Sequence, residues 1–308
     1  MRFMVTGATG FIGIHMTKRL IKEGHTVYVL MRPKSKQRRR FNDEVGLIPH
    51  VIEANFLDRE AVRIAFNRCQ PEVCIHLAWC PVAGGHINGI ENIQYVDATM
   101  HLAECLFEVG CHRLIVTGTC LEYDTTVGYL AENTPLKPNS LYAACKHSLF
   151  EMLTQWASIR GVNLTWIRPF YMYGPYESEN RLVPHVISSL LRGEFVKLTE
   201  GYQMRDYLYI DDVVSAIYTV IAHRIQGPIN VGSGEPVTVR QIVDILARSF
   251  HGSKLIKYGV KNKSKETEEP LFICANIDKL RNQTNWKSRF GLEEGLKATI
   301  EWWQKAAI

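Results

Sequence analysis

Short apolar runs alternate with stretches of helical character through the first half of this 308-residue chain. The runs are FMVTG, TVYVLM, HVIEA, VCIHLA and RLIVTG. Such mostly unbroken apolar strands are typical of a parallel sheet that is covered on both faces. Between them, FIGIHMTKRLIKEGH has apolar residues at helical spacing and stops at Gly24, and MHLAECLFEVG repeats the pattern before Gly110. We therefore predict an α/β fold with a doubly wound parallel sheet.

The alternation of apolar runs and helical stretches ends at Pro169. A segment rich in proline, glycine and aromatic residues, PFYMYGPYESENRLVP, is followed by amphipathic patterns in VISSLLRG, DDVVSAIYTVIAHR and VRQIVDILARSF. Apart from the polar stretch 261–269, no segment has the character of a linker. We predict a Rossmann-type domain over residues 1–168, with a return segment at about 205–232, and a smaller, interleaved C-terminal lobe over residues 169–308.

Composition places the chain among ordinary globular proteins, with 46% hydrophobic and 22% charged residues. No stretch is apolar enough to span a bilayer, and MRFMVTGATG lacks the pattern of a signal peptide, so we expect a soluble cytoplasmic protein with no membrane partner. The cysteines form no CxxC pair and several lie in apolar runs, which favours reduced, structural thiols. They are Cys69, Cys74, Cys80, Cys105, Cys111, Cys120, Cys145 and Cys274.

The net charge of +5 comes from one local cluster, so we expect no nucleic-acid partner. The cluster consists of Arg32, Lys34, Lys36, Arg38, Arg39 and Arg40. Three histidines, His86, His101 and His185, lack the spacing of metal ligands. We predict no metal site.

A glycine-rich turn, GATGFIG, follows the first apolar run at residues 7–13 and opens the first predicted helix. Gly7 permits a sharp turn, Gly10 lets the main chain approach a pyrophosphate, and Gly13 allows close helix packing. The helix N-terminus offers backbone amides to the anion. This context predicts a dinucleotide site that also includes Phe11 and Ile12, the alternative being a plain turn between strand and helix.

The second predicted strand ends at Arg32, where an NAD site normally carries an acidic residue for the ribose 2′-hydroxyl. A guanidinium suits a 2′-phosphate better than a hydroxyl. Arg32 therefore favours NADP, with NAD still possible. The alternative is that residues 34–40 form a solvated basic loop, which we expect for most of the cluster but less for Arg32.

Tyr142 and Lys146 are four residues apart, so they share one face of a predicted helix. A phenol is a poor base at neutral pH unless a nearby cation stabilises its phenolate. Lys146 supplies that cation, and we predict Tyr142 as the catalytic acid/base. An exposed, inactive pair is the alternative, and the upstream glycine turn argues against it.

Seven motifs stand in the order found in one family, and through them the chain resembles the extended short-chain dehydrogenase/reductases, which include nucleotide-sugar epimerases, dehydratases and reductases. The motifs are GATGFIG, IHLA at 75–78, VTGTCLEYD at 116–124, YAACK, RPFYMYGP at 168–175, RDYLYIDD at 205–212 and INVGSGEPVT at 229–238. Together they cover nearly the whole chain.

The resemblance implies further roles. Thr119 would hydrogen-bond the reacting sugar oxygen beside Tyr142, and Lys146 would also hold the nicotinamide ribose. The other implied cofactor contacts are Asn55 and Phe56 at the adenine, Leu77 and Ala78 at the inner ribose, and Pro169 and Met172 near the nicotinamide. Arg205 and Arg181 would contact the substrate's phosphates or nucleotide, which suits a planar, multi-donor cation, although a surface or structural role is the alternative.

The chain also departs from the family pattern. Family dehydratases carry Asp-Glu directly after the catalytic threonine, whereas Cys120 and Leu121 stand here, so we expect no dehydration. Tyr95 occupies a position where many members have asparagine, and residues 266–269 replace a region that often contributes a substrate arginine. The pose of the substrate therefore stays open.

We predict an enzyme that uses NADPH to reduce a 4-keto, 6-deoxy nucleotide-activated sugar, with Tyr142 as proton donor. The NADP preference carries this prediction, because net reduction needs an exchangeable cofactor. The alternative is an NAD-dependent nucleotide-sugar epimerase, which would use the same catalytic residues. A non-catalytic regulatory Rossmann protein is a third possibility, against which the intact Thr119, Tyr142 and Lys146 argue.

Two predicted helical segments, VDATMHLAECLFEVG and LYAACKHSLFEMLTQWA, carry apolar residues on more than one face. Burial against the sheet accounts for one face only. We predict a homodimer packed through these two helices, as in the relatives that the chain resembles.

Overall fold

A computed structural model describes residues 1–35, 37–46, 49–79, 87–260 and 270–306. The chain divides into two compact units that exchange segments along the sequence. The first unit is Met1–Tyr123, Pro135–Arg168 and Val214–Ile229, and the second is Asp124–Thr134, Pro169–Val213 and Asn230–Ile308. The return segment is thus shorter than the expected 205–232, because β10 (Met204–Tyr209) is hydrogen-bonded within a sheet of the second unit.

The first unit is built on a seven-stranded sheet of order β11-β7-β5-β4-β1-β2-β3. Its strands are β1 (Arg2–Thr6), β2 (Thr26–Met31), β3 (His50–Glu53), β4 (Val73–His76), β5 (Arg113–Thr117), β7 (Asn163–Pro169) and β11 (Gly227–Val231). From β7 to β3, each strand in this order pairs in parallel with the next. The chain leaves β3 at one edge and resumes at β4 beside β1, which is the reversal of a doubly wound sheet. The predicted Rossmann-type fold is confirmed.

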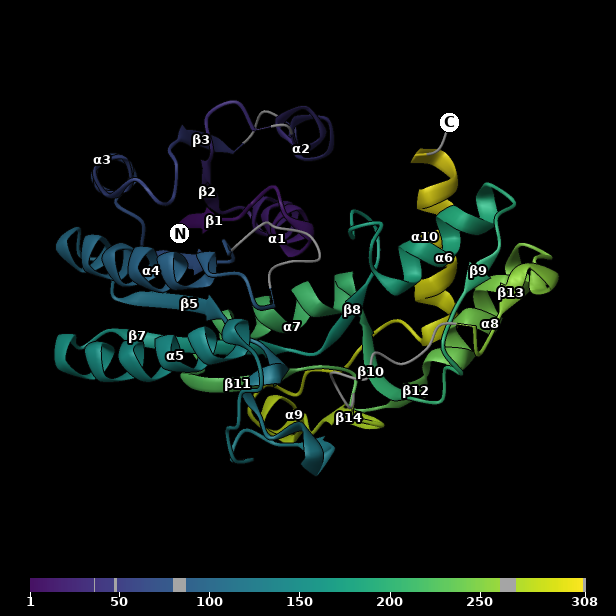
Figure 1. Cartoon of the computed structure of the whole chain (residues 1–308). Helices are drawn as coiled ribbons and strands as arrows, with labels where there is room; N and C mark the ends of the chain where they lie inside the picture. Colours follow the sequence, from purple (N-terminus) through teal and green to yellow (C-terminus); the bar gives the residue numbers. More distant parts are fainter. Residues whose placement is uncertain (36, 47–48, 80–86, 261–269, 307–308) are drawn as a thin grey trace. The chain divides into compact units, whose positions relative to one another are not determined.

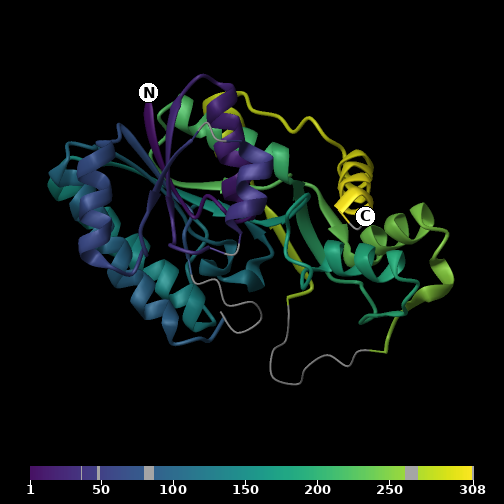
Figure 2. The same ribbon diagram turned by 90° about the horizontal axis from the view of Figure 1, so that it is seen from above.

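Helices cover both faces of this sheet (Figures 1 and 2). They are α1 (Phe11–Lys22), α2 (Arg38–Val45), α3 (Arg59–Cys69), α4 (Glu91–Glu108), α5 (Leu141–Arg160) and α7 (Ile210–Ala222), the last of which enters from the second unit. Helices α3, α4 and α5 pack in a row on one face. On the other, α1 lies near α7, where His25 hydrogen-bonds the Tyr218 hydroxyl at 3.1 Å.

The core of the first unit lies between the sheet and the α3–α5 row. Phe66, Leu102, Leu149 and Trp166 are among its fully buried side chains. The described cysteines are free and buried, in keeping with packing roles, and Cys80 lies outside the described residues. Within the described ranges, no helix has both the length and the apolar character needed to cross a bilayer.

The second unit contains smaller sheets, one of order β12-β10-β14-β6 with β8 paired to β10, and one of β13 with β9. Its elements are η2 (Thr125–Val127), β6 (Tyr129–Leu130), β8 (Tyr171–Tyr173), α6 (Leu182–Leu191), β9 (Val196–Lys197), β10, β12 (Pro236–Thr238), α8 (Val239–Ser249), η3 (Ser253–Leu255), β13 (Ile256–Lys257), β14 (Phe272–Ala275), α9 (Asp278–Thr284) and α10 (Leu292–Ala306). The buried Asp206 carboxylate accepts backbone N–H bonds from Ser233, Gly234 and Ala275 at 2.6, 2.9 and 3.1 Å. This carboxylate therefore ties β10 to two distant segments.

Candidate active site

The glycine-rich turn joins β1 to α1 and is too tight for larger residues. Gly7 has φ +70°, and a Cβ placed there would approach the Ala78 nitrogen at 2.7 Å. A Cβ at Gly13 would overlap the Gly7 carbonyl oxygen, to which the Gly10 N–H donates at 3.0 Å. Helix α1 begins directly afterwards with Phe11 and Ile12. The turn thus has the tight shape, directly before a helix N-terminus, that is typical of a pyrophosphate site.

A cavity of about 290 Å³ opens beside this turn in the first unit. It is lined by Thr6, Gly7, Thr9, Gly10, Leu30, Met31, Arg32, Ser35, Gln37, Ala54, Asn55, Phe56, Leu77, Ala78, Trp79 and Tyr95. Its size is near the lower end for small-molecule sites, enough for part of a dinucleotide. The structure brings seven predicted residues together here: Gly7, Gly10, Arg32, Asn55, Phe56, Leu77 and Ala78. Phe11, Ile12 and Gly13 belong to α1 and are not among the residues that line the cavity.

The basic cluster is more ordered than the solvated loop that we expected. Residues 38–45 form α2, whose apolar Phe41 and Val45 are buried one turn apart, a signal that the sequence contained. Arg38 pairs with Glu53, and Arg40 donates to the Thr9 carbonyl of the glycine turn at 3.0 Å. Arg32 is exposed at the cavity edge, and Lys36 lies outside the described residues. Arg40 is a contact to the turn that sequence reasoning missed.

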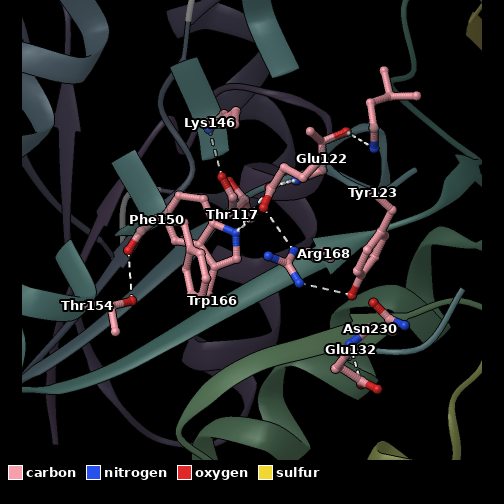
Figure 3. Close-up of polar contacts among 12 residues, drawn as sticks. Thr117, Glu122, Tyr123, Glu132, Lys146, Phe150, Thr154, Trp166, Arg168 and Asn230 are labelled. Carbon is pink, nitrogen blue, oxygen red and sulfur yellow. Dashed lines mark hydrogen bonds and ion pairs between the residues drawn. The ribbon is translucent and has the colours of Figure 1, made fainter. Parts of the chain in front are cut away.

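Helix α5 carries the predicted catalytic pair. It begins after Ser140, whose hydroxyl accepts the Ala143 N–H at 3.3 Å. Tyr142 is half-buried, whereas Lys146 is only 2% exposed and its Nζ donates to the Thr117 carbonyl at 2.7 Å (Figure 3). Burial lowers the pKa of Lys146 to about 7, partly opposed by the Glu122 carboxylate. The lysine is therefore held at the carboxyl end of β5.

Thr119 follows β5 and caps the short helix η1 (Cys120–Glu122). The Glu122 carboxylate accepts the Thr119 N–H at 2.7 Å, and the Thr119 hydroxyl accepts the Leu121 N–H at 3.3 Å. This capping box fixes the backbone that presents Thr119. Cys120 and Leu121, in the positions of a dehydratase Asp-Glu pair, offer no acid/base carboxyl.

Glu122, the last residue of η1, belongs to a buried polar network (Figure 3). The Glu122 carboxylate accepts the Trp166 indole N–H at 3.1 Å and pairs with the Arg168 Nε at 2.9 Å. Arg168 also donates to the Tyr123 hydroxyl at 3.0 Å. Neither Glu122 nor Arg168 has more than 1% of its side chain exposed. Both residues stood in family-like motifs, but the sequence did not indicate that they pair.

The remaining predicted residues belong to the second unit and are placed within it. Pro169 ends β7, and Met172 lies in β8. Arg181 precedes α6 and is exposed. Arg205 is buried in β10, where its guanidinium lies 5.6 Å from the Tyr171 ring centroid and donates to the Met204 carbonyl at 2.9 Å. Part of its hydrogen-bonding capacity therefore serves the fold.

The histidines considered as metal ligands are not gathered with other ligands in the part of the chain that the structure describes. His101 Nε2 is 2.8 Å from the Arg59 carbonyl oxygen, and His185 lies in α6. His86 and residues 266–269 lie outside the described residues.

Comparison with known proteins agrees with this geometry. Residues 3–232 match the model of the NAD dependent epimerase/dehydratase family. The chain is 27% identical over 320 residues to the UDP-glucuronate 4-epimerase of Thermodesulfobacterium geofontis, covering 97% of this chain and 95% of that protein. It is 26% identical over 312 residues to the CDP-abequose synthase of Salmonella muenchen, covering 97% of each. A UDP-glucose 4-epimerase from Thermotoga maritima, solved with UDP-glucose, has a TM-score of 0.88 at 26% identity and 100% coverage of both chains.

The doubly wound sheet, the glycine turn and the Tyr142–Lys146 helix define a dinucleotide-binding enzyme of the extended short-chain dehydrogenase/reductase type. Within that class, the chain belongs to the NAD dependent epimerase/dehydratase family, whose model covers well over half of its length.

Proposed function

We propose that this enzyme uses NADPH to reduce the 4-keto group of a nucleotide-activated sugar, a 6-deoxy hexose. The edge of the cofactor cavity carries this proposal. Arg32, Ser35 and Gln37 line it beside the end of β2, and none of the described lining residues is a carboxylate. Cationic and neutral donors favour a ribose 2′-phosphate, which a carboxylate would repel. A cofactor that exchanges after each turnover suits net reduction.

In this proposal, three residues of the chain have separate roles in the reaction. Bound reduced nicotinamide supplies the hydride that goes to the carbonyl carbon. Tyr142 donates its proton to the carbonyl oxygen, and Thr119 hydrogen-bonds that oxygen. Lys146 stabilises the phenolate that remains and holds the nicotinamide ribose. The rigid attachment of Lys146 and Thr119 to the end of β5 supports these roles.

The same proposal assigns the outer contacts. Gly7, Gly10 and the amides of α1, with Phe11, Ile12 and Gly13 shaping that turn, bind the pyrophosphate. The proposed contacts to the rest of the cofactor are Asn55, Phe56, Leu77, Ala78, Pro169 and Met172, and those to the substrate are Arg181 and Arg205. We also propose a cytoplasmic location, as for an enzyme that uses soluble nucleotide sugars.

Arg32→Asp is expected to reduce the preference for NADPH over NADH by about tenfold or more, because a charge that repels the 2′-phosphate replaces one that pairs with it. Steady-state kcat/KM with each cofactor measures this. Arg39→Asp is the matched control, since the Arg39 side chain is 94% exposed and lines no part of the cavity. An equal loss with both cofactors in Arg32→Asp would remove the NADP assignment.

An NAD-dependent nucleotide-sugar epimerase is the second candidate, favoured by the similarity to 4-epimerases. The two functions differ in whether cofactor is consumed. Incubation with a panel of 4-keto and intact UDP-, GDP-, CDP- and dTDP-sugars, followed at the absorbance of reduced nicotinamide, separates them. Stoichiometric NADPH loss with a 4-keto sugar supports the reductase, whereas isomerisation of an intact sugar without net cofactor change supports the epimerase.

We further propose a homodimer packed through α4 and α5, which contact each other in the first unit. Ile93 of α4 and Met152 and Ile159 of α5 are exposed large apolar side chains. Sedimentation velocity at micromolar concentration is expected to give twice the 35.2 kDa chain mass, and Met152→Glu with Ile159→Glu is expected to give monomer. A wild-type monomer under these conditions would reject the dimer.

A further inference from the structure

Trp79 lies just after β4 and lines the cofactor cavity, yet the glycine and tyrosine motifs assign it no role. Its indole N–H donates to the Asn92 side-chain oxygen at 2.7 Å. Asn92 is fully buried at the start of α4, and its amide donates to the Gly89 carbonyl at 2.8 Å. The indole plane is therefore fixed by a buried partner.

The face of this fixed ring meets the catalytic lysine. Lys146 Nζ lies 3.6 Å from the centroid of the Trp79 ring while it donates to the Thr117 carbonyl at 2.7 Å. The Tyr142 ring contacts Trp79 edge-on, with centroids 6.4 Å apart. An ammonium at this distance from the face of an indole ring is attracted to it electrostatically. The indole thus touches both members of the Tyr142–Lys146 pair.

We propose that Trp79 is a positioning residue, whose indole face keeps the Lys146 ammonium charged and directed toward Tyr142. The assignment rests on the proposed function of that pair. Of the three N–H groups of an ammonium, one is taken by Thr117 and one side is covered by the ring, which leaves a defined direction for a cofactor hydroxyl.

The surrounding charges show why such a contact matters. Burial lowers the pKa of Lys146 to about 7, so little of the ammonium would remain in alkaline solution without compensation. Among the described residues, the titratable side chains with an electrostatic interaction with Lys146 include Glu122 and His76. Glu122 favours the ammonium. His76 is neutral, because burial and then the Lys146 charge lower its pKa to about 3.

The first test measures how protonation of Lys146 changes the free energy of unfolding with pH. Its folded-state pKa is below the unfolded value, so between the two the unfolded chain binds more protons and the free energy of unfolding rises with pH. Urea unfolding at pH 6–10 gives the free energy of unfolding of each variant. The contribution of Lys146 to its pH dependence is the difference between wild type and Lys146→Met. In the absence of the indole, it is the difference between Trp79→Leu and the Trp79→Leu/Lys146→Met double variant. Trp79→Leu is expected to start this rise about one pH unit lower, because the cation–π contact is lost, and Trp79→Phe to shift it less.

The second test reads the contact optically and needs no activity. The emission of Trp79, taken as wild type minus Trp79→Phe, is expected to titrate with Lys146 and to lose this titration in the Lys146→Met background. Trp156→Phe is the matched control, since Trp156 is a half-buried indole on the same helix as Lys146, bonded to Glu104 at 2.6 Å. Its difference emission is expected to stay flat. This emission comparison does not use Trp79→Leu, so it tests the Trp79–Lys146 contact even if Trp79→Leu fails to fold.

Kinetics complete the experiment. Trp79→Leu is expected to lower kcat at pH 8 by about tenfold, matching a shift of one pH unit, while the KM for the nucleotide sugar changes less than about twofold. Equal damage to kcat and KM, with no shift in the Lys146 titration and no titration of the Trp79 emission, would overturn the assignment. The protein could instead show both the Lys146-dependent stability titration and the Trp79 emission titration, yet reduce no 4-keto sugar. That result would uphold the Trp79–Lys146 contact and reject the proposed function.

Discussion

Tyr142→Phe is expected to lower turnover by about a thousandfold while the affinity for NADPH stays within about twofold, because the phenol oxygen that donates the proton is lost and the ring remains. Single-turnover rates with a 4-keto nucleotide sugar and cofactor binding by fluorescence give the two numbers. Tyr202→Phe is the control, since Tyr202 is 63% exposed and is assigned no role in the proposed chemistry.

Lys146→Met is expected to damage both turnover and cofactor affinity, because the lysine is proposed to serve Tyr142 and the nicotinamide ribose together. The rates of reduction and of oxidation are expected to change with pH in opposite directions. Reduction needs Tyr142 protonated, so its rate should fall as the phenol ionises with rising pH, whereas oxidation of the alcohol should gain over the same range. Near-normal turnover of Tyr142→Phe, with an unchanged pH profile, would show that another group moves the proton.

Glu122→Gln is expected to lower the free energy of unfolding by about 3–5 kcal/mol, because it leaves the Arg168 charge buried without its counter-ion. The amide keeps the shape of the side chain and an oxygen that can still accept the Thr119 N–H. Urea unfolding measures the loss, and kcat shows whether the capping box alone suffices to present Thr119. Glu122→Ala removes both charge and acceptor and should lower kcat further.

The exposed pair between Arg160 and Glu104 is the control for this prediction. It has a similar N···O separation, 3.3 Å, but the two side chains are 43% and 40% exposed. Arg160→Met should therefore change the free energy of unfolding by less than about 1 kcal/mol. If Glu122→Gln were no more destabilising than Arg160→Met, burial would not be what makes the Glu122–Arg168 pair important.

The features that the sequence predicted well are local ones. Apolar runs of strand length indicate the parallel sheet, and the glycine turn and the Tyr142–Lys146 spacing each depend on residues within one turn of backbone. The resemblance to a family then supplied residues such as Asn55 and Leu77, which the structure gathers at one cavity. Their individual roles stay predictions.

The features that it missed depend on contacts between distant segments. Glu122 and Arg168 are 46 residues apart, and Trp79 meets Lys146 across a still longer separation. Residue types alone do not indicate such pairs, because a buried ion pair and two exposed charges look the same in a sequence. The helix over residues 38–45 was missed for another reason: its charges obscured the spacing of Phe41 and Val45.

The chain changes unit after residues 123, 134, 168, 213 and 229. During synthesis, the seven-stranded sheet therefore cannot be completed when Arg168 has left the ribosome, because β11, the neighbour of β7, comes later. Until then β7 is an unprotected edge, open to pairing with another nascent chain. A fragment of residues 1–168 would keep that edge permanently, so the cofactor-binding unit cannot be prepared simply by truncation. Any shortened version must rejoin Val214–Ile229 to the N-terminal segment.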